Sequence, residues 1–313
     1  MDTLIYWFAR ALIAMIQALP LTLVARIGRA GGALAYWLDA RHRRVALHNL
    51  EMCLGNGKSP GEIRAIAGEH FRRLGENYAC AIKTFSMSFD ELRSRVEFIG
   101  TEHLLPPRRV VVAIGHFGNF ELYARFGQFL PGYQCATTYR ALNQPALNRL
   151  MQKLRERSGC LFFERRSDGP LLRAAMNRQD IILGLLADQS MEGLRGPFLG
   201  HDCSTTLSPA VFALRYHCAL HTGICYRTGL AQWRIEAGPE IPTHENGKPR
   251  PSGEIMRDVN RALENAVLRD PANWFWVHRR WKPGKSKDQP AAPTCLVEAR
   301  QSEGGSPKPK VIT

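Results

Sequence analysis

A histidine and a glutamate five positions apart are the residues of this 313-residue sequence best suited to chemistry. Both lie in the segment GHFGNFE, residues 115–121. A histidine that is oriented by a carboxylate acts as a general base near neutral pH. Such a base can take the proton of a hydroxyl group that attacks a thioester carbonyl, with no covalent enzyme intermediate. The segment therefore predicts that His116 is the base and that Glu121 orients its ring.

The two side chains can meet only in a particular local structure. A step of five residues on a regular helix leaves two side chains about 140° apart, so they cannot share a helix face. They can meet if His116 lies in a loop before the helix, because Gly115 and Gly118 permit a tight turn there. We therefore expect Glu121 in the first turns of the helix that follows.

Two buried strands are expected near the candidate residues in the sequence. The runs VVVAIG at 110–115 and IILGLLAD at 181–188 are short and apolar, which is typical of buried parallel strands. Ligands of α/β sheets collect at the carboxyl ends of such strands. His116 follows the first run, and Asp188 ends the second.

The remaining pattern indicates an α/β fold with a mostly parallel or mixed central sheet flanked by helices. Residues 1 to about 95 are expected to be helical throughout. Further helices are predicted at 119–130, 144–158, 167–178, 205–217 and 252–269, and further strands at 134–140, 221–228, 232–241 and 274–280. The tail 283–313 is rich in Pro, Gly, Ser and Lys and is predicted to be disordered.

The amino-terminal segment 1–40 is predicted to anchor the protein at a membrane. Between residues 4 and 23 the only strongly polar side chains are Arg10 and Gln17. About 20 helical residues span about 30 Å, which is marginal for a bilayer crossing, and Pro20 and Arg10 argue against a full span. We expect a helix that lies in or dips into the membrane, with packing in the protein core or a full span as alternatives.

The charge of the chain favours an anionic partner. There are 42 Lys and Arg against 28 Asp and Glu, a net charge of +14. Anionic lipid, a phosphorylated substrate or nucleic acid would each suit this excess, and a generally basic soluble protein is the plainer alternative. Arginines 41, 43 and 44 beside Trp37 suit an anionic headgroup region. No nucleic-acid-reading motif is present, so we expect an anionic membrane surface and no nucleic acid.

Cysteine spacing and missing motifs exclude several classes of protein. None of the eight cysteines forms a C-x-x-C pair or a zinc-binding group with histidine, so free thiols in a reducing compartment and no structural metal are expected. The sequence also lacks a Walker motif, a dinucleotide-binding glycine pattern and a G-x-S-x-G elbow.

Several segments occur in a characteristic order. They are RRVALHNL at 43–50, GHFGNFE at 115–121, TYR at 138–140 with NQP at 143–145, ADQS at 187–190 with GPFLG at 196–200, and WFWVHRRWK at 274–282. Over about residues 5–282 the chain resembles the bacterial lipid A biosynthesis acyltransferases. These are the secondary lauroyl and myristoyl transferases of the lysophospholipid acyltransferase superfamily.

The resemblance implies an α/β acyltransferase domain over residues 41–282. His116 and Glu121 would catalyse transfer of a fatty-acyl chain from a thioester of acyl carrier protein or coenzyme A. The acceptor would be a hydroxyl of a membrane glycolipid, first of all a lipid A precursor. No metal or bound cofactor is implied, and the expected location is the cytoplasmic face of the bacterial inner membrane.

The resemblance also implies residues that bind substrate. Arg140 would meet a phosphate or another anionic group of the acceptor, which suits a guanidinium. Asp188 and Gln189 would shape the pocket. Asn119 and Arg149, which belong to the matching blocks, are further candidates for substrate binding.

Three alternatives stay open. One alternative is an acyltransferase whose acceptor is a phosphatidylinositol mannoside or a lysophospholipid. The same His/Glu pair in a lipid esterase would activate water. Finally, the charge alone is compatible with a non-enzymatic protein that binds a membrane surface or nucleic acid.

Overall fold

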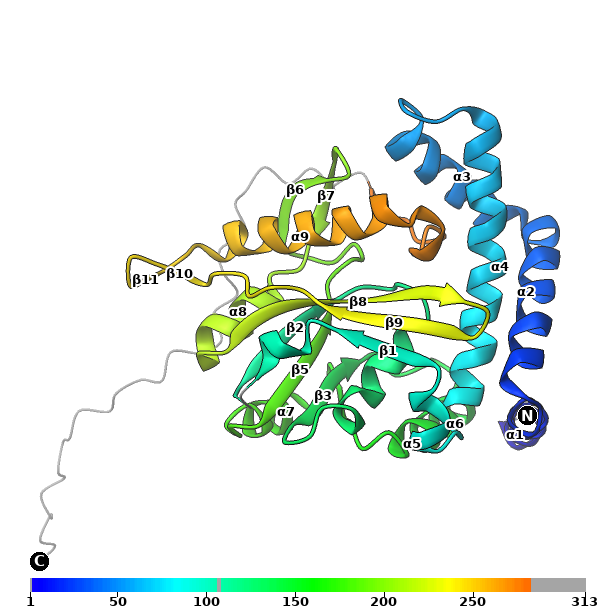
Figure 1. Ribbon diagram of the computed structural model, residues 1–313, viewed down its shortest axis with the longest axis horizontal. Helices are drawn as coiled ribbons and strands as arrows, with labels where there is room; N and C mark the ends of the chain where they lie inside the picture. The colour runs from blue at the N-terminus through cyan, green and yellow to red at the C-terminus, as the bar shows by residue number, and fades with distance from the viewer. Residues whose placement is uncertain (1, 106–107, 283–313) are drawn as a thin grey trace, which may run out of the picture. The chain divides into compact units, whose positions relative to one another are not determined.

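A seven-stranded sheet forms the centre of the molecule (Figure 1), in a computed structural model that describes residues 2–105 and 108–282. The strand order is β1-β9-β8-β2-β5-β3-β4. All neighbouring strands are parallel except β8 and β9, which confirms the predicted α/β class. The strands are β1 (Val96–Ile99), β2 (Val110–Ile114), β3 (Gln134–Tyr139), β4 (Leu161–Glu164), β5 (Ile181–Leu186), β8 (Ala219–Gly229) and β9 (Gln232–Ala237).

Strand β2 is the central strand and the one that positions the site. Every residue of its VVVAI run is buried, as expected for a parallel strand covered on both faces. Its neighbours are β5 and β8, and Ala113 pairs with Leu185 on one side and with Thr222 on the other. The carboxyl ends of β2 and β5 therefore lie side by side, where the chain continues to His116 and Asp188.

Two hydrophobic clusters cover the two faces of the sheet. Val111 and Ala113 of β2 belong to the cluster that includes α8 and α9, whereas Val110, Val112 and Ile114 belong to the cluster that includes η2.

The helices are α1 (Asp2–Ala18), α2 (Leu21–Leu38), α3 (Ala40–Leu54), α4 (Pro60–Thr84), α5 (Phe89–Arg93), α6 (Pro145–Glu156), α7 (Gly169–Ala175), α8 (Ser208–Tyr216), α9 (Ser252–Arg269) and the 3-10 helices η1 (Thr101–Leu104), η2 (Phe120–Gln128) and η3 (Pro271–Asn273). Two short hairpins complete the fold: β6 (Leu194–Phe198) with β7 (His201–Thr205), and β10 (His244–Glu245) with β11 (Lys248–Pro249).

Helices α2 and α4 run against each other with their backbones almost in contact. A Cβ atom on Gly32 would lie 2.1 Å from the carbonyl oxygen of Phe71, and one on Gly75 would lie 2.2 Å from that of Gly28. Side chains larger than hydrogen would force the helices apart, so these glycines fix the close packing. Helix α2 thereby joins the same compact unit as the sheet.

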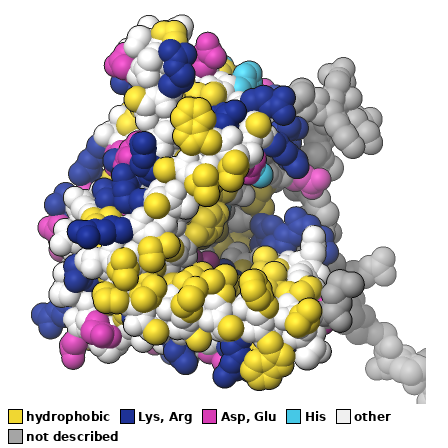
Figure 2. Space-filling model, turned by 90° about the vertical axis from the view of Figure 1, so that its right-hand side faces the viewer, with side chains coloured by type: hydrophobic (Ala, Val, Ile, Leu, Met, Phe, Trp, Pro, Cys, Tyr) yellow, Lys and Arg dark blue, Asp and Glu magenta, His cyan; other side chains and the backbone are white. Residues whose placement is uncertain are grey.

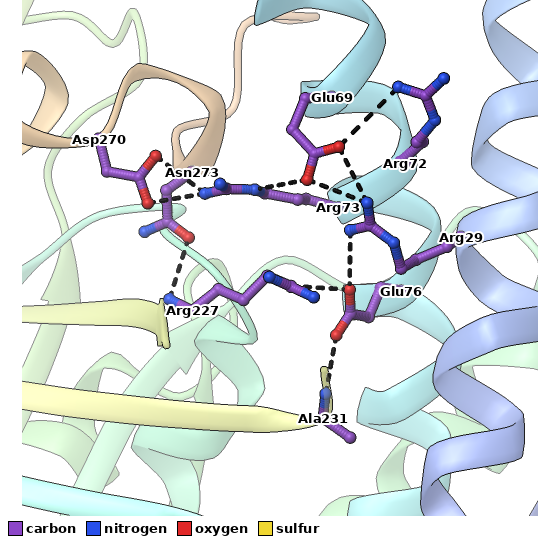
Figure 3. Close-up of polar contacts among 9 residues, drawn as sticks. All are labelled: Arg29, Glu69, Arg72, Arg73, Glu76, Arg227, Ala231, Asp270 and Asn273. Carbon is purple, nitrogen blue, oxygen red and sulfur yellow. Dashed lines mark hydrogen bonds and ion pairs between the residues drawn. The ribbon is translucent and has the colours of Figure 1, made fainter. Parts of the chain in front are cut away.

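A buried ionic cluster fastens these helices to the sheet (Figure 3). Glu76 of α4 is fully buried and accepts hydrogen bonds from Arg29 of α2 at 3.2 Å and from Arg227 of β8 at 2.8 Å. It also accepts from the backbone N–H of Ala231, in the β8–β9 turn, at 2.9 Å. One carboxylate therefore ties together three elements that are far apart in the sequence.

The amino-terminal helices carry many exposed apolar side chains. Helix α1 has no buried residue. The exposed large side chains of α1 and α2, called the apolar face here, are Leu4, Trp7, Phe8, Leu12, Met15, Leu23, Ile27, Leu34, Trp37 and Leu38. Within the described ranges, no helix has the length and hydropathy needed to cross a bilayer. The predicted membrane association is thus left as an expectation.

Several predicted elements differ from the structure. The segment 274–280 is not a strand; it forms turns and a single bridge between Trp274 and Phe117. Its aromatic residues favoured a strand, but they pack beneath the site instead, and the indole of Trp276 donates to the carbonyl oxygen of Pro271. The helix predicted at 205–217 begins only at Ser208, since 201–205 form β7.

Other predictions were confirmed within the described residues. The predicted helix 252–269 has the bounds of α9, and the strands at 110–115 and 181–188 end within two residues of β2 and β5. The segment expected to be helical at 119–130 is the 3-10 helix η2. Seven cysteines are free thiols, as predicted, and the tail 283–313 lies outside the described residues.

Candidate active site

His116 lies in the turn that connects β2 to η2, as the glycines predicted. Gly118 has φ +49°, a left-handed conformation that side chains rarely adopt, and a Cβ there would lie 2.6 Å from the carbonyl oxygen of Cys225. Its N–H donates to the carbonyl oxygen of Asn273 at 3.1 Å. The turn is therefore held between β8 and η3, and it fixes the backbone of His116.

The carboxylate that holds the imidazole belongs to Asp188. Nδ1 of His116 lies 2.8 Å from Oδ1 of Asp188, and the backbone N–H of His116 donates to Oδ2 at 2.7 Å. The indole N–H of Trp274 donates to the same Oδ2 at 2.9 Å. Burial alone would raise the pKa of this carboxyl, but the imidazole and these donors outweigh burial and lower the pKa to about 2. Asp188 is therefore ionised at neutral pH.

This pairing decides which nitrogen of the imidazole is free. An ionised carboxylate has no proton to give, so Nδ1 of His116 donates to it and Nε2 keeps its lone pair. Phe120 and Phe275 lie beside the ring, at centroid distances of 4.9 and 5.6 Å. The amide nitrogen of Gln189 lies 3.4 Å from Nε2. A neutral imidazole held in this way can accept a proton from a hydroxyl group.

The structure corrects the assignment of Glu121 as the orienting residue. Glu121 instead accepts hydrogen bonds from Arg155 of α6, at 2.7 Å to Oε1 and 3.4 Å to Oε2. The guanidinium of Arg155 also lies 5.6 Å from the ring centroid of Tyr139 and 5.2 Å from that of Phe162. Glu121 lies on η2, which faces α6, whereas the turn before η2 directs the imidazole toward the end of β5.

A cavity of about 590 Å³ opens beside the imidazole. Its lining includes His116, Glu121, Gln189 and Arg155. Much of the remaining wall is apolar and comes from strands of the sheet, from η1 and η2 and from the residue before β4: Leu104, Val112, Ile114, Ala124, Phe126, Cys135, Ala136, Cys160, Phe162, Ile182, Leu186 and Ile235. The cavity thus joins a polar end, where the imidazole of His116 lies, to an apolar interior.

Exposed cations also line the cavity. Arg140, Arg165 and Lys282 are exposed, and none forms an ion pair with another described residue. Viewed from the side of α1 and α2, the surface is hollowed, and both apolar and basic side chains border the hollow (Figure 2). Arg140 therefore has the place and the freedom that its predicted role in anion binding requires.

Three of the five predicted substrate-binding residues do not line this cavity. Asn119 is buried, and its carbonyl oxygen accepts from the thiol of Cys225 at 3.6 Å. Arg149 is exposed on α6. Asp188 is also absent from the cavity wall, because it acts behind the imidazole that it holds. Of the five predicted substrate-binding residues, Arg140 and Gln189 line the cavity.

The aromatic segment before Lys282 contributes residues that sequence reasoning did not assign. Trp274 holds Asp188, and Nε2 of His278, which lines the cavity, accepts from the backbone N–H of Ser190 at 3.3 Å. Burial lowers the pKa of His278. Buried Asn49 donates to the carbonyl oxygens of Trp276 at 2.8 Å and His278 at 2.9 Å, so α3 holds this segment in place. The sequence feature that could have indicated these residues was the presence of both the RRVALHNL and the WFWVHRRWK segments.

Comparison with known proteins identifies the family of the chain. Escherichia coli (strain K12) lipid A biosynthesis palmitoleoyltransferase is 24% identical over 284 residues, which covers 88% of this chain and 90% of that protein. The lauroyltransferase of lipid A biosynthesis from the same organism is 23% identical over 289 residues, with the same coverage. Residues 1–283 match the model of the bacterial lipid A biosynthesis acyltransferases. The chain therefore belongs to this family and is an acyltransferase.

Proposed function

We propose that the protein transfers a fatty-acyl chain from an acyl thioester, of acyl carrier protein or coenzyme A, to a hydroxyl of a lipid A precursor. The names of the relatives refer to lipid A biosynthesis, which supports this acceptor. The observation that carries the proposal is the imidazole of His116, which Asp188 holds with Nε2 free beside a cavity with a largely apolar wall. Such a cavity suits a substrate with a long hydrocarbon chain.

The proposed reaction needs one proton acceptor. Nε2 of His116 takes the proton of the acceptor hydroxyl while its oxygen attacks the thioester carbonyl carbon. The tetrahedral adduct then collapses, the carbon–sulfur bond breaks, and the departing sulfur takes the proton from the imidazolium. The products are an ester and a free thiol, and Asp188 stabilises the imidazolium that forms in between.

The apolar walls of the cavity would receive the acyl chain. Val112, Ile114 and Ile182 come from the central strands, and Phe126 comes from η2. Each methylene group moved from water to such surroundings contributes about 0.8 kcal/mol. The chain bound here would bring its thioester carbon to the polar end, where the base lies.

Charged residues of the cavity would bind the anionic parts of the substrates. Arg140, Arg165 and Lys282 are suited to phosphate, which both a lipid A precursor and the phosphopantetheine of the donor carry. Glu121, the second predicted catalytic residue, would act by fixing the guanidinium of Arg155 in the cavity wall.

The apolar face of α1 and α2 would lie in the surface of a membrane, on the cytoplasmic side of the bacterial inner membrane. Tryptophan and large aliphatic side chains suit the boundary between headgroups and acyl chains. Asp2 at the start of α1 accepts from Gln144 at 3.2 Å, and residues 140 and 142 line the cavity. The cavity would therefore open close to the lipid surface, so that a membrane-bound acceptor could reach it.

The test is a transfer assay with purified protein, an acyl thioester and a lipid A precursor in detergent micelles, read by mass spectrometry. We expect a product heavier by one ester-linked acyl group, and none with His116→Ala. His244→Ala, which removes an exposed imidazole on β10, serves as the matched control and should keep the wild-type rate.

The same assay separates the alternatives. Wild-type rate with His116→Ala, while its thermal unfolding matches the wild type, would contradict the proposed base. Release of fatty acid without any acylated lipid would indicate an esterase. Acylation of a phosphatidylinositol mannoside or a lysophospholipid in place of the lipid A precursor would change the proposed acceptor.

A further inference from the structure

The side-chain amide of Gln189 lies next to Nε2 of His116, the nitrogen that acts as the base in the proposed reaction. Its Nε2 atom is 3.4 Å from Nε2 of His116, the nitrogen left free by Asp188. Since that nitrogen is a hydrogen-bond acceptor, the amide must present an N–H to it. In the free enzyme the base is therefore already in contact with a donor from the protein.

An attacking hydroxyl must take the place of this amide. The unprotonated imidazole nitrogen has one lone pair, in the plane of the ring, and accepts one good hydrogen bond. A hydroxyl that gives its proton to His116 needs that same direction. The amide of Gln189 and the hydroxyl therefore compete for a single position.

Gln189 is free to give way because little else holds its side chain. Its contact with His116 is its only side-chain hydrogen bond to a residue in the ranges 2–105 and 108–282. The side chain is half-buried and lines the cavity. Its backbone, in contrast, is fixed directly after Asp188 at the end of β5, so a displaced amide stays near the base.

A displaced amide would lie next to the oxygen that becomes negatively charged. In the tetrahedral adduct the attacking oxygen and the former carbonyl oxygen are bonded to the same carbon. A donor that has just left the position of the attacking oxygen is therefore close to the other one. An N–H aimed at this developing charge stabilises the transition state more than the ground state.

We infer that Gln189 has two roles in the proposed reaction. In the free enzyme it occupies the position of the attacking hydroxyl at His116, which hinders water from being activated there. When the acceptor hydroxyl displaces it, the amide donates to the oxyanion of the adduct. This inference rests on the proposed transfer, and it adds a residue that favours transfer over hydrolysis of the thioester.

The reaction that competes with transfer is hydrolysis of the thioester. Water that gives its proton to Nε2 of His116 attacks the thioester carbon, the thiol departs with that proton, and a free fatty acid forms instead of an ester. With the amide of Gln189 removed, water can reach Nε2, and the adduct loses a donor. Hydrolysis should therefore rise relative to transfer while transfer itself slows.

The test measures free fatty acid and acylated lipid in one reaction. For Gln189→Ala we expect kcat of transfer to fall about 100-fold, as when one oxyanion donor is lost, with KM changed less than about threefold. The ratio of fatty acid to acylated lipid should rise about tenfold or more. Gln232→Ala removes an exposed glutamine side chain from β9, outside the cavity, and should keep both values.

A second variant separates hydrogen bonding from mere filling of space. Gln189→Glu keeps the shape, but a carboxylate donates to neither Nε2 nor an oxyanion, so the same loss of kcat is expected. Wild-type kcat and product ratio in both variants would overturn the inference. Absence of transfer by the wild-type protein would instead overturn the proposed function on which it rests.

Discussion

Two buried carboxylates in this molecule, those of Glu76 and Asp188, differ in the side chains that pair with them. Glu76 is fully buried, and its partners are Arg29, Arg227 and a backbone N–H (Figure 3). Arginine stays protonated at any ordinary pH, so the side-chain partners of Glu76 do not exchange protons with it. Asp188 is 1% exposed, but its partner is an imidazole whose other nitrogen is free beside a cavity.

The comparison shows that burial of a carboxylate does not by itself mark a catalytic site. A carboxylate between two guanidinium groups can only hold elements together. A carboxylate that faces a histidine determines where the proton of that histidine lies, and so which atom can act as a base. The partner and its access to the cavity separate the two roles, and each role can be tested by removing one charge.

The largest expected effect is that of Asp188→Asn on catalysis. The amide of asparagine can donate to Nδ1 of His116, so the ring proton would move to Nε2 and the base would be lost. We expect kcat of transfer to fall by about 10³- to 10⁴-fold, as in enzymes where the same exchange sets the wrong tautomer.

Glu121→Gln is the matched control for this loss of charge. It removes the partner of Arg155 but leaves the contact of His116 with Asp188 intact, so its loss of rate should be clearly smaller. A larger loss with Glu121→Gln than with Asp188→Asn would return the orienting role to Glu121.

Glu76→Gln should act on stability and hardly on chemistry. Removing the charge leaves Arg227 without its carboxylate partner, while Arg29 keeps its ion pair with Glu69. Breaking a buried ion pair by removing one partner typically costs about 3–5 kcal/mol. Denaturant unfolding should show this loss, while kcat per folded molecule at low temperature stays near the wild-type value. An unchanged free energy of unfolding would contradict the structural role of the cluster.

A smaller effect is the pH dependence of stability that arises from His70, a buried histidine that pairs with no carboxylate of the described residues. Burial lowers the pKa of His70 to about 4, from an ordinary value of 6.5. Between pH 6.5 and 4 the unfolded chain binds a proton there and the folded protein does not, so acidification lowers the free energy of unfolding. The contribution reaches about 3 kcal/mol at pH 4.

Equilibrium unfolding of the wild type and of His70→Gln across this pH range would measure that contribution. The difference between their free energies of unfolding should change with pH by about the amount given. Asp188 acts in the opposite sense, because its lowered pKa stabilises the fold above pH 4 and the contribution is lost only toward pH 2. A pH-independent difference would contradict the burial of a neutral His70.

The fold was readable where a single principle decides the local structure. The run VVVAI has the composition of a buried strand, and it forms β2. Ser59 and Glu62 form the capping box that begins α4. Segments decided by tertiary packing were missed. The aromatic run that begins at Trp274 has the composition of a strand, yet it is held by Asn49 and by the indole contact with Asp188.

The site was readable in part for the same reason. The spacing of residues 115–121 correctly predicted the turn that carries the candidate base His116, because glycines fix that turn locally. Its partner could not be read from spacing, because Asp188 reaches it from the neighbouring strand, 72 residues later in the chain. Which side of η2 carries Glu121 depends on α6, so the sequence alone favoured the nearer carboxylate.

The central claim is that Asp188 holds the proton of His116 on Nδ1 and leaves Nε2 free to act as the base. Nitrogen-15 NMR of histidine-labelled protein tests it directly at about pH 9, where an ordinary imidazole is neutral. The account predicts a His116 signal, assigned with His116→Ala, that has the proton on Nδ1, and a shift to Nε2 in Asp188→Asn. A proton on Nε2 in the wild-type protein would contradict it.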